Sequence, residues 1–337
     1  MMITKNNLEQ AAEKNIISPE QVEPLFQFLT QQSSDLVADS YDELREEPLK
    51  FIRSFGDIFL TLGIVLLVIS ISLSSISGMY YIFPVIGFIL IAEWLVRIRR
   101  LALPGMAILV AILYFVQKMM MFETEHATFL MFAVLALTSF LFYFRYKMPF
   151  SLLPFAASLV SMVIMQIGFD VMQYPVVFAA MGLFVFAFAF WFDSRDTRRI
   201  SHLSDNAFWL YLLASPLIVH GVMVSILLSD QVWIASISKE VLMIVFFALF
   251  FILALFLDRR AMLISTQLYI IYSLTQLFKG TLTNAQDVIM YVLVGLGLFV
   301  LYFGAYWYKT RRFIFSGLAG KAICRYVPDL NIQDIKK

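Results

Sequence analysis

Long, uninterrupted runs of apolar residues dominate the chain from Phe55 onward. A helix needs about 20 residues to cross the roughly 30 Å hydrocarbon core of a bilayer, whereas the strands of a membrane barrel are about 10 residues of alternating polarity. The runs therefore predict an all-α, polytopic membrane helix bundle of about ten transmembrane helices. The expected segments lie at residues 55–76, 79–97, 101–121, 127–144, 149–169, 174–192, 206–228, 240–257, 261–279 and 285–307.

Composition supports this class of protein and excludes others. Of the 337 residues, 61% are hydrophobic and 15% are charged, against about 45–50% and about 25% in ordinary soluble domains. The one cysteine, Cys324, rules out a disulfide scaffold within the chain. With 25 Lys and Arg against 24 Asp and Glu, the chain lacks the strongly basic character of nucleic-acid binding. We expect the lipid bilayer, and no nucleic acid, as its main partner.

The positions of the cations predict an orientation in the membrane. Sixteen Lys or Arg residues precede the first segment or follow the even-numbered segments, and the opposite connections carry only Lys118, Lys239 and Lys279. Cytoplasmic connections are enriched in Lys and Arg, so both termini are expected in the cytoplasm. No secretory signal precedes residue 55, because residues 1–54 lack a sufficiently long apolar run. No residue-level similarity relates the first five segments to the last five.

The pattern divides the chain into four regions. Residues 1–34 are expected to form a cytoplasmic helical hairpin, whose second helix begins at Ser18, Pro19 and Gln21 with the residues of a capping box. Its small apolar core either docks onto the membrane domain or binds a protein partner. Residues 35–54 are predicted to be an acidic linker, 55–308 a ten-helix transmembrane domain, and 309–337 a basic tail lying on the anionic cytoplasmic leaflet.

Sequence motifs of enzymatic chemistry are not found. The chain has no phosphate-binding glycine loop, nucleophile elbow, paired-cysteine metal site or His-Glu-x-x-His run. We therefore expect no catalytic, cofactor or metal site and no enzyme. Glu123, Glu125 and His126 could touch a cation, but a solvated loop accounts for them more simply. Glu93 and Arg97 are spaced for an ion pair within one helix.

The seventh segment carries polar residues at membrane depth. Asn206, Trp209, Pro216 and His220 share one helical face. Pro216 frees the carbonyl of Leu212, which predicts a kink or local unwinding beside His220. Two interpretations of His220 stay open: a pH-sensitive or ligand-contacting residue in a cavity, or a neutral histidine that is hydrogen-bonded to a neighbouring helix.

Polar residues in the ninth and tenth segments complete the candidate polar cavity. Tyr269, Tyr272 and Gln276 follow helical spacing in the ninth segment, and Asp287 and Tyr291 share a side of the tenth. Such residues either line an aqueous path or join helices by hydrogen bonds. Asp287 is also placed to cap the N-terminus of the tenth helix.

Three motifs carry a family resemblance: Ile17-Ser18-Pro19-Glu20-Gln21, Ser204 to Leu210 leading into Pro216-Leu217-Ile218-Val219-His220, and Leu257-Asp258-Arg259-Arg260-Ala261. The chain resembles a family of bacterial integral membrane proteins of unknown function with a short soluble N-terminus. This resemblance implies a location in the bacterial inner membrane and no particular reaction. The chain has Tyr211 where members often carry histidine, which argues against a two-histidine site.

Two functions of different class are consistent with the sequence. The first is a carrier or channel-like transporter of a small solute, favoured by the many spans and the polar residues in segments seven, nine and ten. The second is a non-transporting membrane scaffold or assembly partner that acts through its N-terminal hairpin. Convergence of His220, Tyr272 and Gln276 on one hydrated cavity would distinguish the first from the second.

Overall fold

The computed structural model of the chain describes residues 8, 12, 18–27, 54–120, 125–167, 174–197, 199, 201–228, 238–279, 285–318 and 326–328. The chain forms two compact units, one of residues 1–49 and 333–337 and the other of residues 50–332. In the described part of the chain every regular element is a helix. The prediction of an all-α protein is therefore confirmed.

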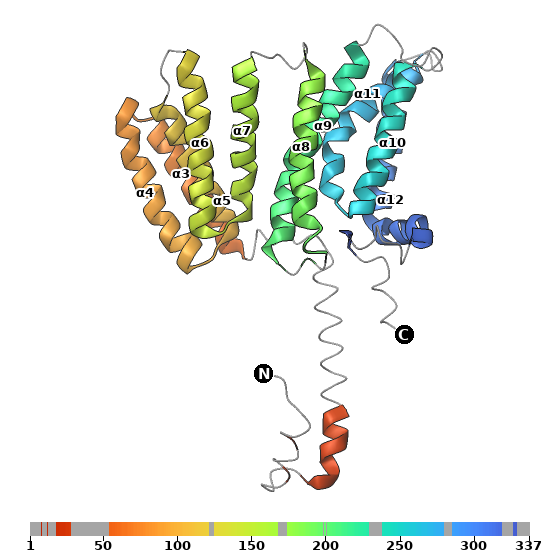
Figure 1. The fold of residues 1–337 in the computed structure, drawn as a ribbon, viewed down its shortest axis with the longest axis horizontal. Coiled ribbons are helices and arrows are strands. Elements are labelled where there is room, and N and C mark those ends of the chain that lie inside the picture. The colour runs from red at the N-terminus through yellow and green to blue at the C-terminus, as the bar shows by residue number, and fades with distance from the viewer. Residues whose placement is uncertain are drawn as a thin grey trace. The chain divides into compact units, whose positions relative to one another are not determined.

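The larger unit is built by helices α3 to α12 and their 3-10 and π-helical extensions (Figure 1). Together these elements cover the ten predicted apolar segments. In chain order they are α3 (Phe55–Ser72), η2 (Gly78–Tyr81), α4 (Ile82–Ala92), η3 (Glu93–Ile98), α5 (Ala102–Met119), α6 (Glu125–Tyr146), η4 (Pro149–Ser151), α7 (Leu152–Ile167), α8 (Pro175–Asp193), α9 (His202–Leu228), α10 (Lys239–Leu257), η5 (Arg260–Thr266), α11 (Gln267–Leu277), α12 (Ala285–Phe315) and η6 (Ser316–Leu318).

Eight of these helical segments are long and apolar enough to cross a membrane, which makes the chain a multi-pass membrane protein. The remaining two are the fifth and ninth predicted segments. The apolar part of the fifth, Pro149–Met165, is shorter. The ninth is divided into the 3-10 helix η5 and the short α11. Three consecutive polar residues, Ser265 to Gln267, lie where η5 passes into α11, so this segment lacks a long apolar α-helix.

Two hydrophobic cores lie side by side in the larger unit. One is built by α3 to α6, the other by α7 to α12. Between these two cores the main packing is that of α6 on α7, and α9 also packs on η4, whose Phe150 packs against the first core. The rings of Phe150 and Trp209 meet edge to face there, with centroids 4.8 Å apart. Helix α9 therefore joins the two groups of helices, and much of its surface is buried.

Two glycines allow α8 and α9 to pack at very short range. A Cβ atom at Gly182 would lie 2.7 Å from the backbone nitrogen of Ile218, and one at Gly221 would lie 2.7 Å from the carbonyl oxygen of Pro175. Real Cβ atoms do not approach backbone atoms this closely. Small residues let membrane helices approach each other in this way, so the α8–α9 pair is held closer than ordinary side chains allow.

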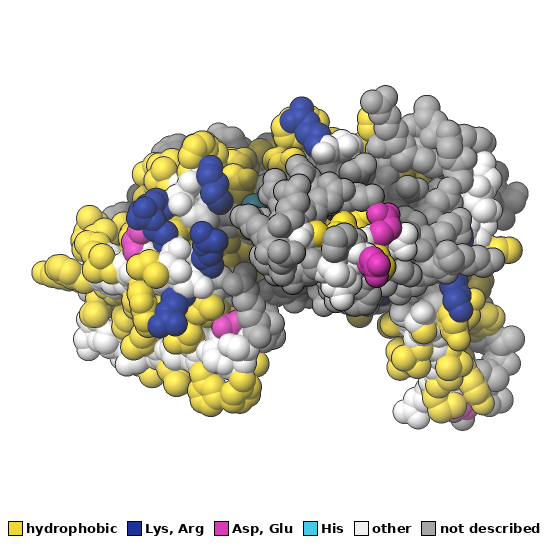
Figure 2. Space-filling view, turned by 90° about the horizontal axis from the view of Figure 1, so that it is seen from below, with side chains coloured by type: hydrophobic (Ala, Val, Ile, Leu, Met, Phe, Trp, Pro, Cys, Tyr) yellow, Lys and Arg dark blue, Asp and Glu magenta, His cyan; other side chains and the backbone are white. Residues whose placement is uncertain are grey.

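One end of the larger unit, here called the basic end, is where α6, α8 and α10 end and α9 begins. Lys and Arg side chains gather on this face (Figure 2). Four residues at this end have left-handed backbone conformations: Arg100, Lys147, Arg199 and Asp258. Helix α12 bends at Tyr306 (φ −113°, ψ 20°), close to the predicted start of the tail. In Figure 1 the part after this bend lies across the basic end.

The smaller unit is described only in part. Leu8 and Val22, from the two predicted helices of the hairpin, are both buried. The backbone nitrogen of Ser18 donates to Oε1 of Gln21 at 3.1 Å, the bond that the capping box predicts. Several predicted features lie outside the described residues: residues 35–53 of the acidic linker, residues 319–325 with Cys324, and the side chains of Glu123, Glu125 and His126.

Candidate functional site

Two of the predicted site residues meet within the larger unit. Nδ1 of His220 on α9 lies 2.6 Å from the hydroxyl oxygen of Tyr269 on α11, and the two rings are 5.3 Å apart at 65°. The residues are 49 positions apart in the chain. A hydrogen bond of this length joins α9 to α11. The pairing agrees with the interpretation of His220 as a histidine bonded to a neighbouring helix, but the residue is also accessible.

His220 is the single exposed residue between Leu203 and Leu227 of α9. Every other residue of that stretch is buried or half-buried beneath neighbouring helices. The exposure has a local cause: η5 packs on α9, whereas α11 packs mainly on α10 and α12. The helical cover of α9 is thus incomplete beside His220. Polar side chains at membrane depth usually face the bundle interior or a water-filled cavity.

The η5–α11 segment brings further polar atoms to this region. Oε1 of Gln267 and Oγ1 of Thr275 are buried and have no hydrogen-bond partner among the described residues. Ser273 donates to the carbonyl oxygen of Tyr269 at 2.7 Å, as hydroxyl groups commonly do within helices. The segment therefore presents polar groups and an irregular backbone at membrane depth, next to the His220–Tyr269 pair.

Other predicted residues of α9 pack against the first group of helices. Nδ2 of Asn206 donates to the hydroxyl oxygen of Tyr143 on α6 at 2.8 Å, and Asn206 is almost completely buried. Trp209 is buried against Phe150. Helix α9 continues through Pro216, so of the two predicted alternatives, a kink or local unwinding, the unwinding is absent. Asn206 and Trp209 thus join helices, and Pro216 is half-buried, so none of the three shares the exposed position of His220.

The last four predicted residues are distributed over α11 and α12. Tyr272 is 43% exposed. Gln276 accepts a hydrogen bond from Nζ of Lys279 at 3.4 Å. Asp287 lies in the first turn of α12, where a carboxylate favours the helix N-terminus, and Tyr291 is 59% exposed. The structure shows no contact that brings Tyr272 or Gln276 to His220, within the residues that it describes.

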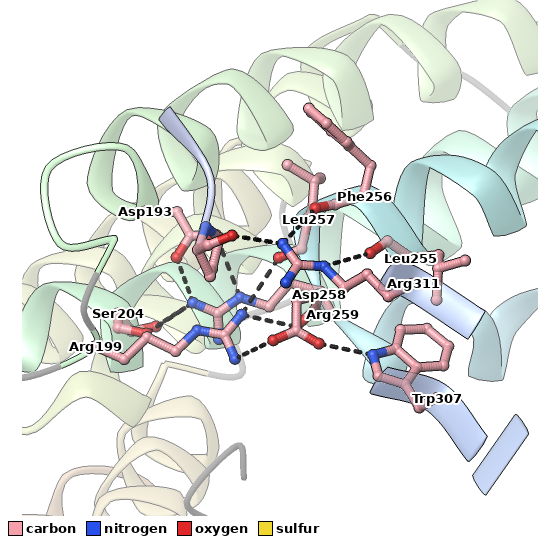
Figure 3. Close-up of polar contacts among 11 residues, drawn as sticks. Asp193, Arg199, Ser204, Leu255, Phe256, Leu257, Asp258, Arg259, Trp307 and Arg311 are labelled. Atoms are coloured by element: carbon pink, nitrogen blue, oxygen red, sulfur yellow. Dashed lines mark hydrogen bonds and ion pairs between the residues drawn. The ribbon is translucent and has the colours of Figure 1, made fainter. Parts of the chain in front are cut away.

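A buried cluster of charged residues at the basic end was not predicted from the sequence. Nε and Nη2 of Arg259 donate to the carboxylate of Asp193 at 3.3 and 2.5 Å, and Nη2 also donates to Oγ of Ser204 at 2.8 Å. The side chains of Arg259 and Asp193 are each 3% exposed. This ion pair joins the end of α8 to the start of α9 and to the turn that follows α10 (Figure 3).

Asp258 forms the second ion pair of the cluster. Its carboxylate forms an ion pair with Nη1 of Arg199 at 3.1 Å and accepts a hydrogen bond from Nε1 of Trp307 on α12 at 2.7 Å (Figure 3). Asp258 is the C-cap of α10 and has a left-handed conformation, φ 57°, which aspartate adopts more readily than most residues. The turn at Asp258 thereby directs consecutive charged side chains toward separate partners.

The carbonyl groups at the end of α10 accept hydrogen bonds from two arginines of this cluster. Nε and Nη2 of Arg311 donate to Leu255 and Phe256 at 3.1 and 3.3 Å, and Nη2 of Arg199 donates to Leu257 at 3.3 Å. The last carbonyls of a helix have no partner within the helix, and a cation there also favours the helix dipole. Arg311 is only 5% exposed, so this part of the predicted basic tail is inserted among helices rather than lying on a leaflet.

We expect the cluster to be structural, because its charges already bind one another. The sequence contains a partial signal for the cluster, because Asp193 and Asp258 lie close to arginines at the ends of predicted segments. The rule that predicts membrane orientation explains the arginines but not the two aspartates. Among the described residues, no three His, Cys, Asp or Glu side chains are placed to hold one metal ion. The accessible polar position at membrane depth is that of His220 and Tyr269, which we take as the candidate site.

The fold and the candidate site define an all-helical, multi-pass membrane protein with an accessible polar pair inside its membrane-spanning part. No family model, curated protein or solved structure matches the chain.

Proposed function

We propose that the protein is a carrier or channel-like transporter of a small solute in the bacterial inner membrane. In this proposal the chain crosses the membrane ten times, with both termini and the basic end in the cytoplasm. The distribution of cations supports the orientation. The ninth crossing then consists of η5 and α11, and the fifth of η4 and α7.

Tyr272 and Gln276 do not meet His220 among the described residues, so the proposal rests instead on one observation, the pair formed by the exposed His220 and the half-buried Tyr269. In the lipid hydrocarbon, an uncovered imidazole would lose its hydration without compensation, and Tyr269 binds only one of its two nitrogens. An aqueous pathway beside α9 and α11 would hydrate the other nitrogen. The pair would then lie where a solute exchanges hydrogen bonds with the protein.

The irregular backbone of η5 and α11 supports the same location. Transporters bind their substrates near the bilayer midplane, where discontinuous helices expose backbone and polar side chains to the ligand. Non-α-helical backbone at membrane depth occurs where it is buried in protein or lines a water-filled cavity. The division of the ninth segment next to His220 fits such a pathway.

Cysteine labelling tests whether the position is hydrated. In a Cys324→Ser background, His220→Cys should react with a charged, membrane-impermeant methanethiosulfonate reagent applied to both faces of membrane vesicles. Thiols react as thiolates, which form in water and not in hydrocarbon. The matched control is Leu249→Cys on α10, a position that is 62% exposed and apolar. It should stay unlabelled until detergent is added.

Labelling at Leu249→Cys alone, or none at His220→Cys in vesicles, would contradict an aqueous pathway. A His220→Cys protein that reacts fully after solubilisation would show that its thiol is intact. The experiment does not require the identity of the solute.

A second candidate function is that of a membrane scaffold or assembly partner acting through the N-terminal hairpin. It is favoured by the separate compact unit formed by residues 1–49 and 333–337 and by Leu25, which is 39% exposed on its second helix. Deletion of residues 1–45 should then abolish co-purification of a specific partner while the membrane domain still folds. An unchanged set of co-purified proteins would contradict this function.

A further inference from the structure

An apolar groove runs along the surface of the larger unit between α7 and α8. Its volume is about 580 Å³, and every lining residue is apolar. The lining extends from Leu152 to Val163 on α7 and from Val177 to Phe192 on α8, with Leu210 of α9 at its base. Helices α7 and α8 both pack on α9 but make little contact with each other. The groove is the space left between them, and its volume is typical of a ligand site.

The position of the groove indicates what fills it. Helix α8 is one of the membrane-spanning helices, and Val163, Phe184 and Phe188 on the rim are 43%, 66% and 48% exposed. The medium that meets this rim is therefore lipid hydrocarbon. At 1.5 Å per residue, the lining stretches of α7 and α8 are about 16 and about 22 Å long. One leaflet of the hydrocarbon core is about 15 Å thick, so a single acyl chain fits lengthwise.

A cation lies beside the groove at the basic end of the larger unit. The guanidinium group of Arg195 stacks on the ring of Trp191, 3.8 Å from its centroid. The same ring meets Phe192, a lining residue, edge to face at 5.0 Å. Arg195 is exposed and forms no ion pair with any described residue. Arginine binds phosphate through paired N–H groups, so the basic end of the groove is complementary to an anionic headgroup.

We propose that this groove binds one acyl chain of an anionic phospholipid, with Arg195 binding the phosphate of its headgroup. The site is separate from the His220–Tyr269 pair, which lies on α9 and α11, and it does not depend on a transport function. Bound in this position, the lipid would complete the contact between α7 and α8 that the protein itself leaves open.

The test uses the delipidated full-length protein in detergent, titrated with dioleoyl phosphatidylglycerol or dioleoyl phosphatidylcholine and followed by native mass spectrometry. The wild-type protein should retain one phosphatidylglycerol in preference to phosphatidylcholine. Ala180→Phe places a ring in the groove and should weaken this binding by about tenfold or more, the equivalent of about 1.4 kcal/mol. Leu183→Phe is the control, because Leu183 is 58% exposed on another face of the same helix and does not line the groove.

Two further variants keep the test decisive. Val163→Trp fills the groove from α7, so a folding defect of Ala180→Phe alone does not decide the outcome. Arg195→Gln should abolish the preference for phosphatidylglycerol, because it weakens binding of this anionic lipid more than binding of phosphatidylcholine, whose choline group already offsets the charge of its phosphate. Equal lipid retention by Ala180→Phe, Val163→Trp and Leu183→Phe would overturn the groove site and would show that the retained lipid is ordinary surrounding lipid. A preference that survives Arg195→Gln would overturn the role of the arginine.

Discussion

Gly221→Ala is expected to destabilise the protein strongly, although it adds only one methyl group. The new Cβ would lie 2.7 Å from the carbonyl oxygen of Pro175 and 2.8 Å from Cα of Ala179. Both atoms belong to the backbone of α8, so no side-chain rotation relieves the contact, and the two helices must move apart. Overpacking of a well-packed core typically costs about 1–3 kcal/mol, and we expect the upper end of this range or more.

The measurement is the temperature at which the detergent-solubilised protein loses its monodisperse gel-filtration peak. Gly297→Ala on α12 is the matched control, because nothing lies within 4 Å of the added Cβ and the glycine is also helical. Its loss temperature should be unchanged or slightly higher, since alanine favours a helix by about 1 kcal/mol over glycine. If Gly221→Ala and Gly297→Ala behave alike, the glycine at 221 does not set the spacing of α8 and α9.

Much of the fold follows from the hydrophobic pattern because the length of an apolar run limits what it can form. Helix boundaries follow less well. Helix α9 begins at His202, four residues before the predicted segment, because the carboxylate of Asp196 accepts hydrogen bonds from the backbone nitrogen and hydroxyl of Ser201. Such a contact depends on the path of the preceding loop. The hydrophobic run does not encode it.

The candidate site shows the same division between what periodicity predicts and what it does not. Helical spacing placed His220 on a polar face of one helix and Tyr269 on a polar face of another. Helical spacing does not say which faces of two helices meet when their residues are 49 positions apart in the chain. The hydrogen bond between His220 and Tyr269 is therefore seen only in the structure. Exposure is likewise a tertiary property: η5 covers part of α9 and leaves His220 accessible.

The arginines of the basic end show that the sequence pattern does not predict which charged residues are buried. The rule that predicts orientation counts cations without regard to burial. In the structure Arg97 and Arg195 are exposed, whereas Arg199, Arg259 and Arg311 are buried and bonded. A charged residue is buried only where a carboxylate or a row of carbonyls compensates it. Those partners come from helices that are distant in the sequence.

Removal of one member of the buried Asp193–Arg259 pair is expected to destabilise the protein substantially. Arg259→Met leaves the carboxylate of Asp193, which is 3% exposed, without its cation. Breaking a buried pair by removing one partner costs about 3–5 kcal/mol, because the other charge stays desolvated. The loss temperature of the monodisperse protein should fall accordingly. Arg97→Met is the control, because Arg97 pairs with Glu93 while its side chain is 59% exposed, and such surface pairs contribute about 0–1 kcal/mol.

The double variant Asp193→Leu/Arg259→Met distinguishes an unpaired charge from lost packing. It removes both charges, and apolar replacement of a whole buried pair is often neutral or stabilising. The double variant should therefore recover most of the stability that Arg259→Met loses, despite carrying one more substitution. If the double variant is instead no more stable than Arg259→Met, the desolvated charge is not the main cost. The helices at the basic end then depend on the Arg259 side chain itself, through its hydrogen bonds to Ser204 and its position over the ring of Tyr211.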